Sequence, residues 1–181
     1  MSNQPQLQPS EEVDEQQLDL AREAGETYRQ AVDYMIEEVA HTGGREREGD
    51  YVVGFAQEEA EGMYRMTEGD LEWVEPGDDE NCHLEVTAAA AADGRFVPGL
   101  DVTATLEGED ETIGPEPIPF VWHPGLYHYG ANLTIPGDGT YDITIEIAPA
   151  TFPRHDEQNG DRFAETVVVE FDDVDVQAGT H

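Results

Sequence analysis

The sequence contains no lysine, and its eight basic residues, all arginines, stand against 42 aspartates and glutamates in 181 residues. The formal net charge of −34 excludes nucleic-acid binding through a basic surface. A single cysteine, Cys82, excludes a disulfide within the chain. No segment reaches the roughly 18–20 uninterrupted apolar residues of a membrane span, so we expect no membrane insertion. The N-terminus shows neither the basic start nor the apolar stretch of a signal peptide, so the sequence by itself predicts a cytoplasmic location.

The excess of acidic residues has two possible meanings. One is an acidic surface that binds cations, and the other is adaptation to molar salt. At about 1 M salt the Debye length is roughly 3 Å, so neighbouring carboxylates hardly repel one another. The acidic residues are spread along the whole chain rather than gathered in one tract. This distribution favours a protein of a halophile and says little about its activity.

The N-terminal part predicts a tail followed by one helix. Residues 1–9 are polar and contain proline, which is typical of a disordered tail. Ser10 followed by two glutamates predicts a helix over 10–42 that ends at Gly43-Gly44, with a linker over 43–50. One apolar stripe runs along this helix at alternating steps of three and four: Leu18, Ala21, Tyr28, Val32, Met35 and Val39, with Gly25 in the missing position. The stripe fits pairing with a second helix and packing on the chain's own domain equally well.

From Tyr51 onward the apolar residues alternate with a period of two. Clear examples are the segments 84–88, 100–106 and 141–147, in which apolar and polar residues take turns. Turn-like stretches, including 107–118 and a hairpin turn at 137–140, separate the runs. Seven or so short strands without interleaved helices predict an all-β antiparallel sandwich over 51–181.

The histidines are the residues most suggestive of chemistry, because the sequence has no phosphate-binding glycine loop, nucleophile elbow, paired-cysteine zinc motif or EF-hand. His83 and Glu85 are two apart on a predicted strand, so both side chains leave one face, with about 7 Å between their Cα atoms. His128 lies between two tyrosines and His155 lies in a loop. Imidazole and carboxylate groups are ligands for divalent transition metals. His41 and His181 receive no role.

The segments that carry these histidines resemble a known family. HLEV at 83–86, GRFVPGLDVTATL at 94–106, YHYGANLTIPGDGTYDITIEIAP at 127–149 and RHD at 154–156 are similar, in this order, to the periplasmic iron-transport protein family. The resemblance implies an immunoglobulin-like sandwich, commonly a homodimer, which binds copper or iron and assists high-affinity ferrous uptake beside a membrane iron permease. It also implies His83, Glu85, His128 and His155 as metal ligands, with Asp156 or Tyr127 orienting the imidazoles.

The sequence departs from the family pattern at one ligand. The family usually carries a methionine seven residues before the histidine of the HYGAN segment, and here that position is Val121. His123 is a candidate replacement, although it also reads as an ordinary residue of a surface loop. Met63 is a second candidate. We expect Cys82 to face away from His83 and to be a core thiol.

Two features of context also depart from the family. Its members are exported, whereas no leader is visible here, and the N-terminal helix has no counterpart in the family pattern. We expect a binding protein rather than an enzyme, one that holds iron or copper in support of metal uptake or transport. The alternatives are a copper-dependent redox enzyme that oxidises ferrous iron, and a β-sandwich interaction module without metal.

Overall fold

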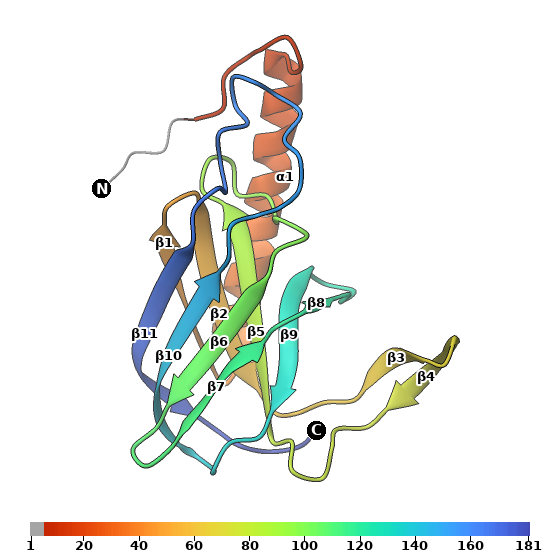
Figure 1. Ribbon diagram of the computed structural model, residues 1–181, viewed down its shortest axis with the longest axis vertical. Helices are drawn as coiled ribbons and strands as arrows, with labels where there is room; N and C mark the ends of the chain where they lie inside the picture. Colours follow the sequence, from red (N-terminus) through yellow and green to blue (C-terminus); the bar gives the residue numbers. More distant parts are fainter. Residues whose placement is uncertain (1–5) are drawn as a thin grey trace.

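The computed structural model describes residues 6–181 and shows two antiparallel sheets packed face to face, with one helix outside them (Figure 1). The first sheet contains, in spatial order, β1 (Thr42–Glu48), β2 (Tyr51–Glu58), β5 (Cys82–Ala90), β9 (His128–Leu133) and β8 (Phe120–Val121). The second sheet contains β11 (Val167–Val176), β10 (Gly139–Ile147), β6 (Val102–Glu107) and β7 (Thr112–Pro117). The predicted all-β sandwich is confirmed, and it is consistent with an immunoglobulin-like fold.

A separate two-stranded hairpin projects from the sandwich. It consists of β3 (Met63–Thr67) and β4 (Asp70–Val74), and Figure 1 shows it extending away from both sheets. Tyr64 and Trp73 lie opposite each other on it and are exposed. The hairpin thus lies outside the core.

The core forms between the inner faces of the two sheets because the strands alternate strictly. In β5 the residues Leu84, Val86 and Ala88 are fully buried in it, and in β10 the same is true of the isoleucines at 143, 145 and 147. Cys82 belongs to this cluster, as expected, and burial raises the pKa of its thiol to about 12. The side chains of the odd-numbered residues of β5 therefore point outward, away from the core.

The helix packs on the outer face of the first sheet. It comprises α1 (Glu15–Tyr34) and a π-helical turn, η1 (Met35–Val39). Val32 and Met35 are buried against Ala56 of β2 and Leu126. Gly25 touches the backbone of residues 93 and 94, where a Cβ would lie 1.7 Å from the Asp93 carbonyl oxygen. Of the two possibilities left open by the stripe, the structure shows packing on the chain's own domain.

The start of the helix differs from the prediction. The N-cap is Asp14, whose carboxylate accepts from the Gln17 backbone N–H at 2.8 Å, while the Gln17 side chain accepts from the Asp14 N–H at 3.0 Å. Ser10 lies before the helix, where its hydroxyl accepts from the Glu12 backbone N–H at 3.1 Å and donates to Asp156 Oδ2 at 2.8 Å. The capping box satisfies two backbone donors at once, which a lone serine does not.

The segment predicted as a linker is a strand. β1 pairs along its whole length with β2, from Thr42 opposite Gln57 to Glu48 opposite Tyr51. It is an edge strand with mostly polar residues, so it lacks the alternation by which the other strands were recognised.

Two connections and the tail also differ from expectation. The 137–140 turn joins β9 to β10 and so connects the two sheets rather than forming a hairpin, and the 107–118 stretch contains β7. In the tail, which was predicted to be disordered, Gln8 exchanges two hydrogen bonds with Asn159, at 2.9 and 2.8 Å. The remainder of that prediction, residues 1–5, lies outside the described residues.

Within residues 6–181, no helix combines the length and apolar character needed to cross a membrane.

Candidate metal centre

Two adjacent strands bring three ligand-type side chains to the outer face of the first sheet. His83 and Glu85 are odd-numbered residues of β5, so their side chains point away from the core. His128 begins β9 and precedes Tyr129, which pairs with Val86, so it falls on the same face. All three are buried, with exposed fractions of 0, 3 and 1%. The structure thus brings together three of the four residues that the family resemblance implies as metal ligands.

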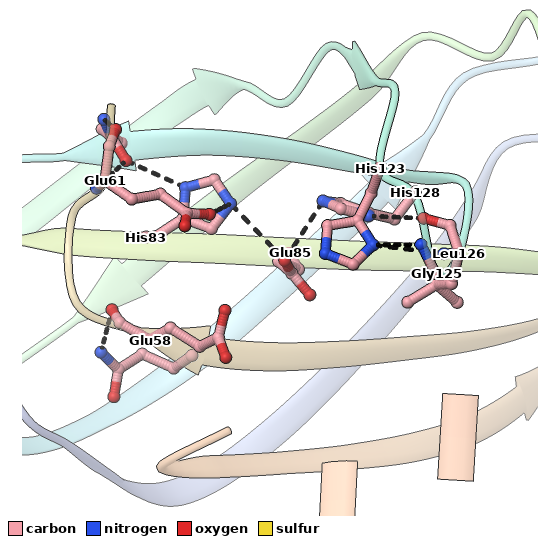
Figure 2. A network of polar contacts seen from close by, with 10 residues as sticks. Glu58, Glu61, His83, Glu85, His123, Gly125, Leu126 and His128 are labelled. Atoms are coloured by element: carbon pink, nitrogen blue, oxygen red, sulfur yellow. Dashed lines mark hydrogen bonds and ion pairs between the residues drawn. The ribbon is translucent and has the colours of Figure 1, made fainter. Parts of the chain in front are cut away.

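The ligand atoms of this His83–Glu85–His128 cluster surround one point (Figure 2). Glu85 Oε1 lies 3.2 Å from His128 Nε2 and 3.7 Å from His83 Nε2. One ligand atom from each of the three residues lies within 4.8 Å of the others, which is close enough for a single ion to touch all three.

Hydrogen bonds on the far side of each ring fix its tautomer. His83 Nδ1 lies 2.9 Å from Asn132 Oδ1, and His128 Nδ1 lies 3.1 Å from the Leu126 carbonyl oxygen. Both partners are acceptors, so each Nδ1 carries the hydrogen and each Nε2 presents a lone pair. Among the described residues, His83 Nε2, His128 Nε2 and Glu85 Oε2 are buried without a hydrogen-bond partner. Both nitrogens face Glu85 Oε1, and acceptors that face one another require a cation or a proton between them.

Burial sets the protonation of the cluster when no ion is bound. It lowers the pKa of His128 to about 4, and the neighbouring His83 and His123 rings act in the same direction. Burial also raises the pKa of Glu85 to about 8, helped by the charges of Glu58 and Glu61. The ion-free centre at neutral pH therefore has a neutral His128 and a protonated Glu85. A cation would displace that proton and restore the carboxylate.

His123 lies beside the cluster but presents the other tautomer. Its ring centroid is 5.6 Å from that of His128. Its Nδ1 accepts from the backbone N–H groups of Gly125 and Leu126, at 2.9 and 3.2 Å, as Figure 2 shows. The hydrogen of the neutral ring is then on Nε2, so His123 must give up these two bonds and change tautomer to coordinate through Nε2.

His155 is not brought to the cluster within this chain. It lies in the 148–166 loop between β10 and β11, its side chain is 97% exposed, and it contacts Glu12 at 3.4 Å. Asp156 beside it accepts from Ser10 and from Asn159 rather than orienting a ligand imidazole. As a ligand, His155 stays a prediction that needs a second chain.

Met63 and Tyr127 flank the centre in different ways. Met63 opens the projecting hairpin and is half-buried, so its role also stays a prediction. Tyr127 is 49% exposed, and its carbonyl oxygen accepts from the Tyr28 hydroxyl, which ties the helix to the residue before His128. Val121 lies opposite His128 in the β8–β9 pairing, so the position of the family's methionine does adjoin the cluster, with a side chain that cannot coordinate.

Sequence reasoning missed Asn132, although it is part of the HYGAN segment. Its Oδ1 meets His83 Nδ1 and also accepts from the Glu61 N–H at 3.3 Å, while its Nδ2 donates to the Glu61 carbonyl oxygen at 2.8 Å. On β9 it lies directly opposite His83. An amide four residues after the ligand histidine, on the same face of a strand, was the available signal.

Comparison with known proteins gives a family and several similar structures. Residues 46–177 match the family described as Fe²⁺ transport protein. No curated protein matches the chain. The crystal structure of FetP from uropathogenic Escherichia coli, as isolated after expression in the periplasm, is 23% identical with a TM-score of 0.60 and covers 75% of this chain and 94% of its own.

Two further similar structures contain copper. A copper-bound FetP variant with one glutamate replaced by glutamine is 23% identical, with a TM-score of 0.58, and covers 74% of this chain and 96% of its own. A copper-bound variant of Campylobacter jejuni P19 with one methionine replaced by isoleucine is 18% identical, with a TM-score of 0.58, and covers 75% of this chain and 96% of its own. At these identities the likeness shows a shared fold.

Proposed function

Because residues 46–177 are most of the chain, it belongs to the Fe²⁺ transport protein family, and we propose that it binds a divalent transition metal ion at His83, Glu85 and His128 in support of iron uptake or transport. The observation that carries this proposal is that His83 Nε2 and His128 Nε2 are buried without a hydrogen-bond partner among the described residues, and both face Glu85 Oε1. A partner permease in the membrane and a homodimer are parts of the proposal that follow from the family resemblance.

The donor set favours a borderline cation. Two imidazole nitrogens and one carboxylate oxygen suit Cu²⁺ and Fe²⁺, whereas a thioether would favour Cu⁺. Valine in place of the methionine at position 121 therefore shifts the preference away from Cu⁺. The copper-bound P19 variant, in which one methionine is replaced by isoleucine, supports the view that copper binding in this fold does not require every methionine.

The test is a Cu²⁺ titration of metal-stripped protein in molar potassium chloride. We expect one tightly bound ion and an electron paramagnetic resonance spectrum with nitrogen couplings from two imidazoles. His128→Ala should weaken binding by more than the roughly 10–100-fold that loss of a supporting residue costs. His41→Ala, which removes an imidazole outside the cluster, is the matched control and should bind like the wild type. Equal affinities for all three proteins would disprove the site.

Two further measurements address the finer parts of the proposal. His155→Ala weakens copper binding only if a second chain contributes that residue, and light scattering of the loaded protein reports the dimer directly. Ferrous oxidation by the copper-loaded protein should be no faster than by the same concentration of free copper. Sustained turnover above that level would instead favour the redox enzyme.

A further inference from the structure

A pocket of about 560 Å³ lies between the helix and the outer face of the first sheet. Its lining comes from α1, from β1, from Val52 of β2 and from the end of β5 with the loop that follows. Among the described residues that line it, none belongs to the His83–Glu85–His128 cluster. On β5 the lining begins at Thr87, the next outward-pointing residue after Glu85. Its volume is within the roughly 300–1,000 Å³ that small-molecule sites occupy.

Short side chains leave this space open. The chain has five consecutive alanines at 88–92, and those at 89–92 line the pocket together with Val52. The helix is held over this apolar floor where Gly25 touches the backbone of Asp93 and Gly94. An apolar floor receives the apolar part of a ligand, and a few polar groups then decide which ligand binds.

One of these polar groups is a buried hydroxyl. Thr87 is 2% exposed, and its side chain has no hydrogen-bond partner among the described residues. It lies opposite Gly54 of β2, where a Cβ would be 2.5 Å from Thr87 Oγ1, so glycine leaves room for the hydroxyl. A buried hydroxyl without a partner costs free energy unless water or a bound group meets it.

Strand pairing places two guanidinium groups beside this hydroxyl. Gly54 also lies opposite Arg45 of β1, so Arg45, Gly54 and Thr87 form one row across three strands. The Cβ position of Gly54 is 3.7 Å from Arg45 Cγ, which puts the Arg45 side chain on the face that carries the hydroxyl. Arg47, two residues further along β1 and opposite Val52, belongs to the same face.

The arginines of the chain are concentrated at this pocket. Four of the eight line it, namely Arg22, Arg29, Arg45 and Arg47. The same lining includes only three acidic residues, although the chain has 42 of them. Positive charges therefore outnumber negative ones here, on a molecule whose net charge is −34.

Ion pairs use only part of these guanidinium groups. Arg29 is fully engaged, with Glu26 at 2.7 and 3.0 Å and with Asp33 at 2.6 Å. Arg45 contacts Asp33 through Nη1 alone, at 2.7 Å. Within residues 6–181 the Arg47 side chain has neither an ion pair nor a hydrogen bond. Guanidinium groups with free N–H donors bind carboxylates in a bidentate geometry.

We propose that this pocket binds a small organic anion that has a carboxylate group and an apolar body. The carboxylate accepts from Arg47, Arg45 and the Thr87 hydroxyl, and the apolar body lies on the alanine floor under the helix. An uncharged molecule would leave the guanidinium groups without a partner, and a wholly polar anion would leave the floor in water. Both α1 and Arg45 lie outside the residues that match the family, so the pocket is built by this chain's own N-terminal addition.

The experiment titrates metal-stripped protein with 2-naphthoate in molar potassium chloride and follows the fluorescence anisotropy of the naphthoate. At this ionic strength screening leaves only direct contacts, so the net charge of the molecule does not obscure the result. We expect one bound naphthoate, and the uncharged 2-naphthamide should bind at least about tenfold more weakly because it lacks the charge. Equal binding of the acid and the amide, or no binding of the acid, would overturn the inference.

Two variants locate the anion. Arg47→Gln should weaken naphthoate binding at least about tenfold, and Thr87→Val should weaken it by about 2–10-fold. Arg65→Gln is the matched control, because Arg65 is also an exposed strand arginine without an ion pair among the described residues, on the projecting hairpin. It should bind naphthoate like the wild type. An Arg47→Gln protein that binds as tightly as Arg65→Gln would show that the anion lies elsewhere.

Copper separates this inference from the proposed function, on which it does not depend. His128→Ala should lose Cu²⁺ and keep naphthoate, whereas Arg47→Gln should lose naphthoate and keep Cu²⁺. If naphthoate binds only to the copper-loaded protein and is lost in His128→Ala, it coordinates the metal and the pocket is not its site. If Cu²⁺ does not bind while naphthoate depends on Arg47, the metal centre fails and the anion pocket stands.

Discussion

Glu85 is the central residue of the cluster. One of its carboxylate oxygens faces the lone pairs of two imidazoles, and the carboxylates of two further glutamates lie nearby. Without an ion, the buried side chain holds a proton, which keeps a negative charge out of the interior. The ion-free protein is therefore stabilised by a protonation state that metal binding must reverse. Stability and metal affinity consequently respond to pH in opposite directions.

The stability of the metal-free protein should fall as the pH rises from 6.5 to 8. The pKa of Glu85 is about 8 in the folded protein against 4.5 for an ordinary glutamate, so the folded state binds the proton more tightly and its stabilisation is lost as the pH rises through 8. The pKa of His128 is lowered to about 4, and its opposite contribution is complete above 6.5. We expect the free energy of unfolding to fall by at most about 1.4 kcal/mol per pH unit in this window.

Denaturant unfolding of the metal-stripped protein at several pH values measures this effect. Glu85→Gln is the control, because its amide does not titrate, and it should remove the decline. A wild-type protein whose stability runs parallel to that of Glu85→Gln from pH 6.5 to 8 would contradict the assignment. Copper affinity should rise over the same interval, because the ion competes with the Glu85 proton.

Asn132→Ala should weaken copper binding by about 10–100-fold, since the amide fixes the ring of His83 and the tautomer that presents Nε2. Asn81→Ala is a matched control, because Asn81 also bonds a backbone segment through both ends of its amide, at Ile135, without touching a ligand. Isothermal titration compares the two. A similar loss of affinity in both variants would show that Asn132 acts through general stability alone.

At this scale the sequence pointed to the residues that the structure brings together as proposed ligands, and it was silent about what orients them. Parity along β5 placed His83 and Glu85 on one face, and the resemblance added His128. Asn132 and Glu61 meet only because β9 lies beside β5 and the loop after β2 folds over their ends. Such contacts depend on strand order, which alternation within one strand does not specify.

The helix lies outside the residues that match the family, and it covers the sheet face from which the proposed ligands project. Tyr28 reaches the carbonyl oxygen of Tyr127, one residue before His128, and Val32 packs near Leu126. Gly25 permits the close approach of the helix to the backbone of Asp93 and Gly94. The helix thereby contributes to the burial that shifts the pKa values of the centre.

Gly25→Ala should destabilise the protein although alanine favours helices by about 1 kcal/mol over glycine. The new Cβ would overlap the Asp93 carbonyl, and relieving such an overlap costs about 1–3 kcal/mol. Glu23→Ala, on the exposed side of the same helix, should change stability by less than about 0.5 kcal/mol. Denaturant unfolding measures both. A Gly25→Ala protein as stable as the wild type would show that the helix is not tightly seated.

The elements were predictable where a pattern of side chains defined them. The apolar stripe located the helix, and alternation located β5, β6 and β10. The polar edge strand β1 had no such pattern, and its existence depends on backbone pairing with β2. The helix start was misplaced because Ser10 and Asp14 are both good caps, and only the Asp14–Gln17 pair completes a capping box.

The charge of the whole molecule is the property most open to a simple test. A net charge of −34 on 181 residues repels itself at low ionic strength. We propose that the surface is adapted to molar salt, where screening over about 3 Å removes most of that repulsion. The acidity as a whole then describes the medium in which the protein works.

The midpoint of thermal unfolding should rise by on the order of 10 °C between 0.1 and 2 M potassium chloride, which corresponds to about 3–5 kcal/mol for a chain of this size. Differential scanning calorimetry of the metal-stripped protein measures it. Sucrose at equal osmolality is the control, since it does not screen charge. A midpoint that responds equally to sucrose and to salt would argue against electrostatic adaptation.

The sandwich architecture followed from the alternation and spacing of the strands, but their number and their connections did not. The 137–140 turn crosses between the sheets, and nothing in its four residues distinguishes such a crossing from a hairpin turn. Which strands become neighbours is decided by the packing of both faces together.

The strict alternation of β5 also limits how this protein can change during evolution. Its even-numbered residues build the core, and its odd-numbered residues His83 and Glu85 belong to the proposed metal centre, so inserting or deleting one residue within 82–87 would exchange the two faces. Substitutions there can be tested one at a time, but changes of length cannot be accommodated. The hairpin between Glu61 and Glu80 is free of this constraint. Lineages of this fold should therefore differ in length at the hairpin while keeping the length of β5 fixed.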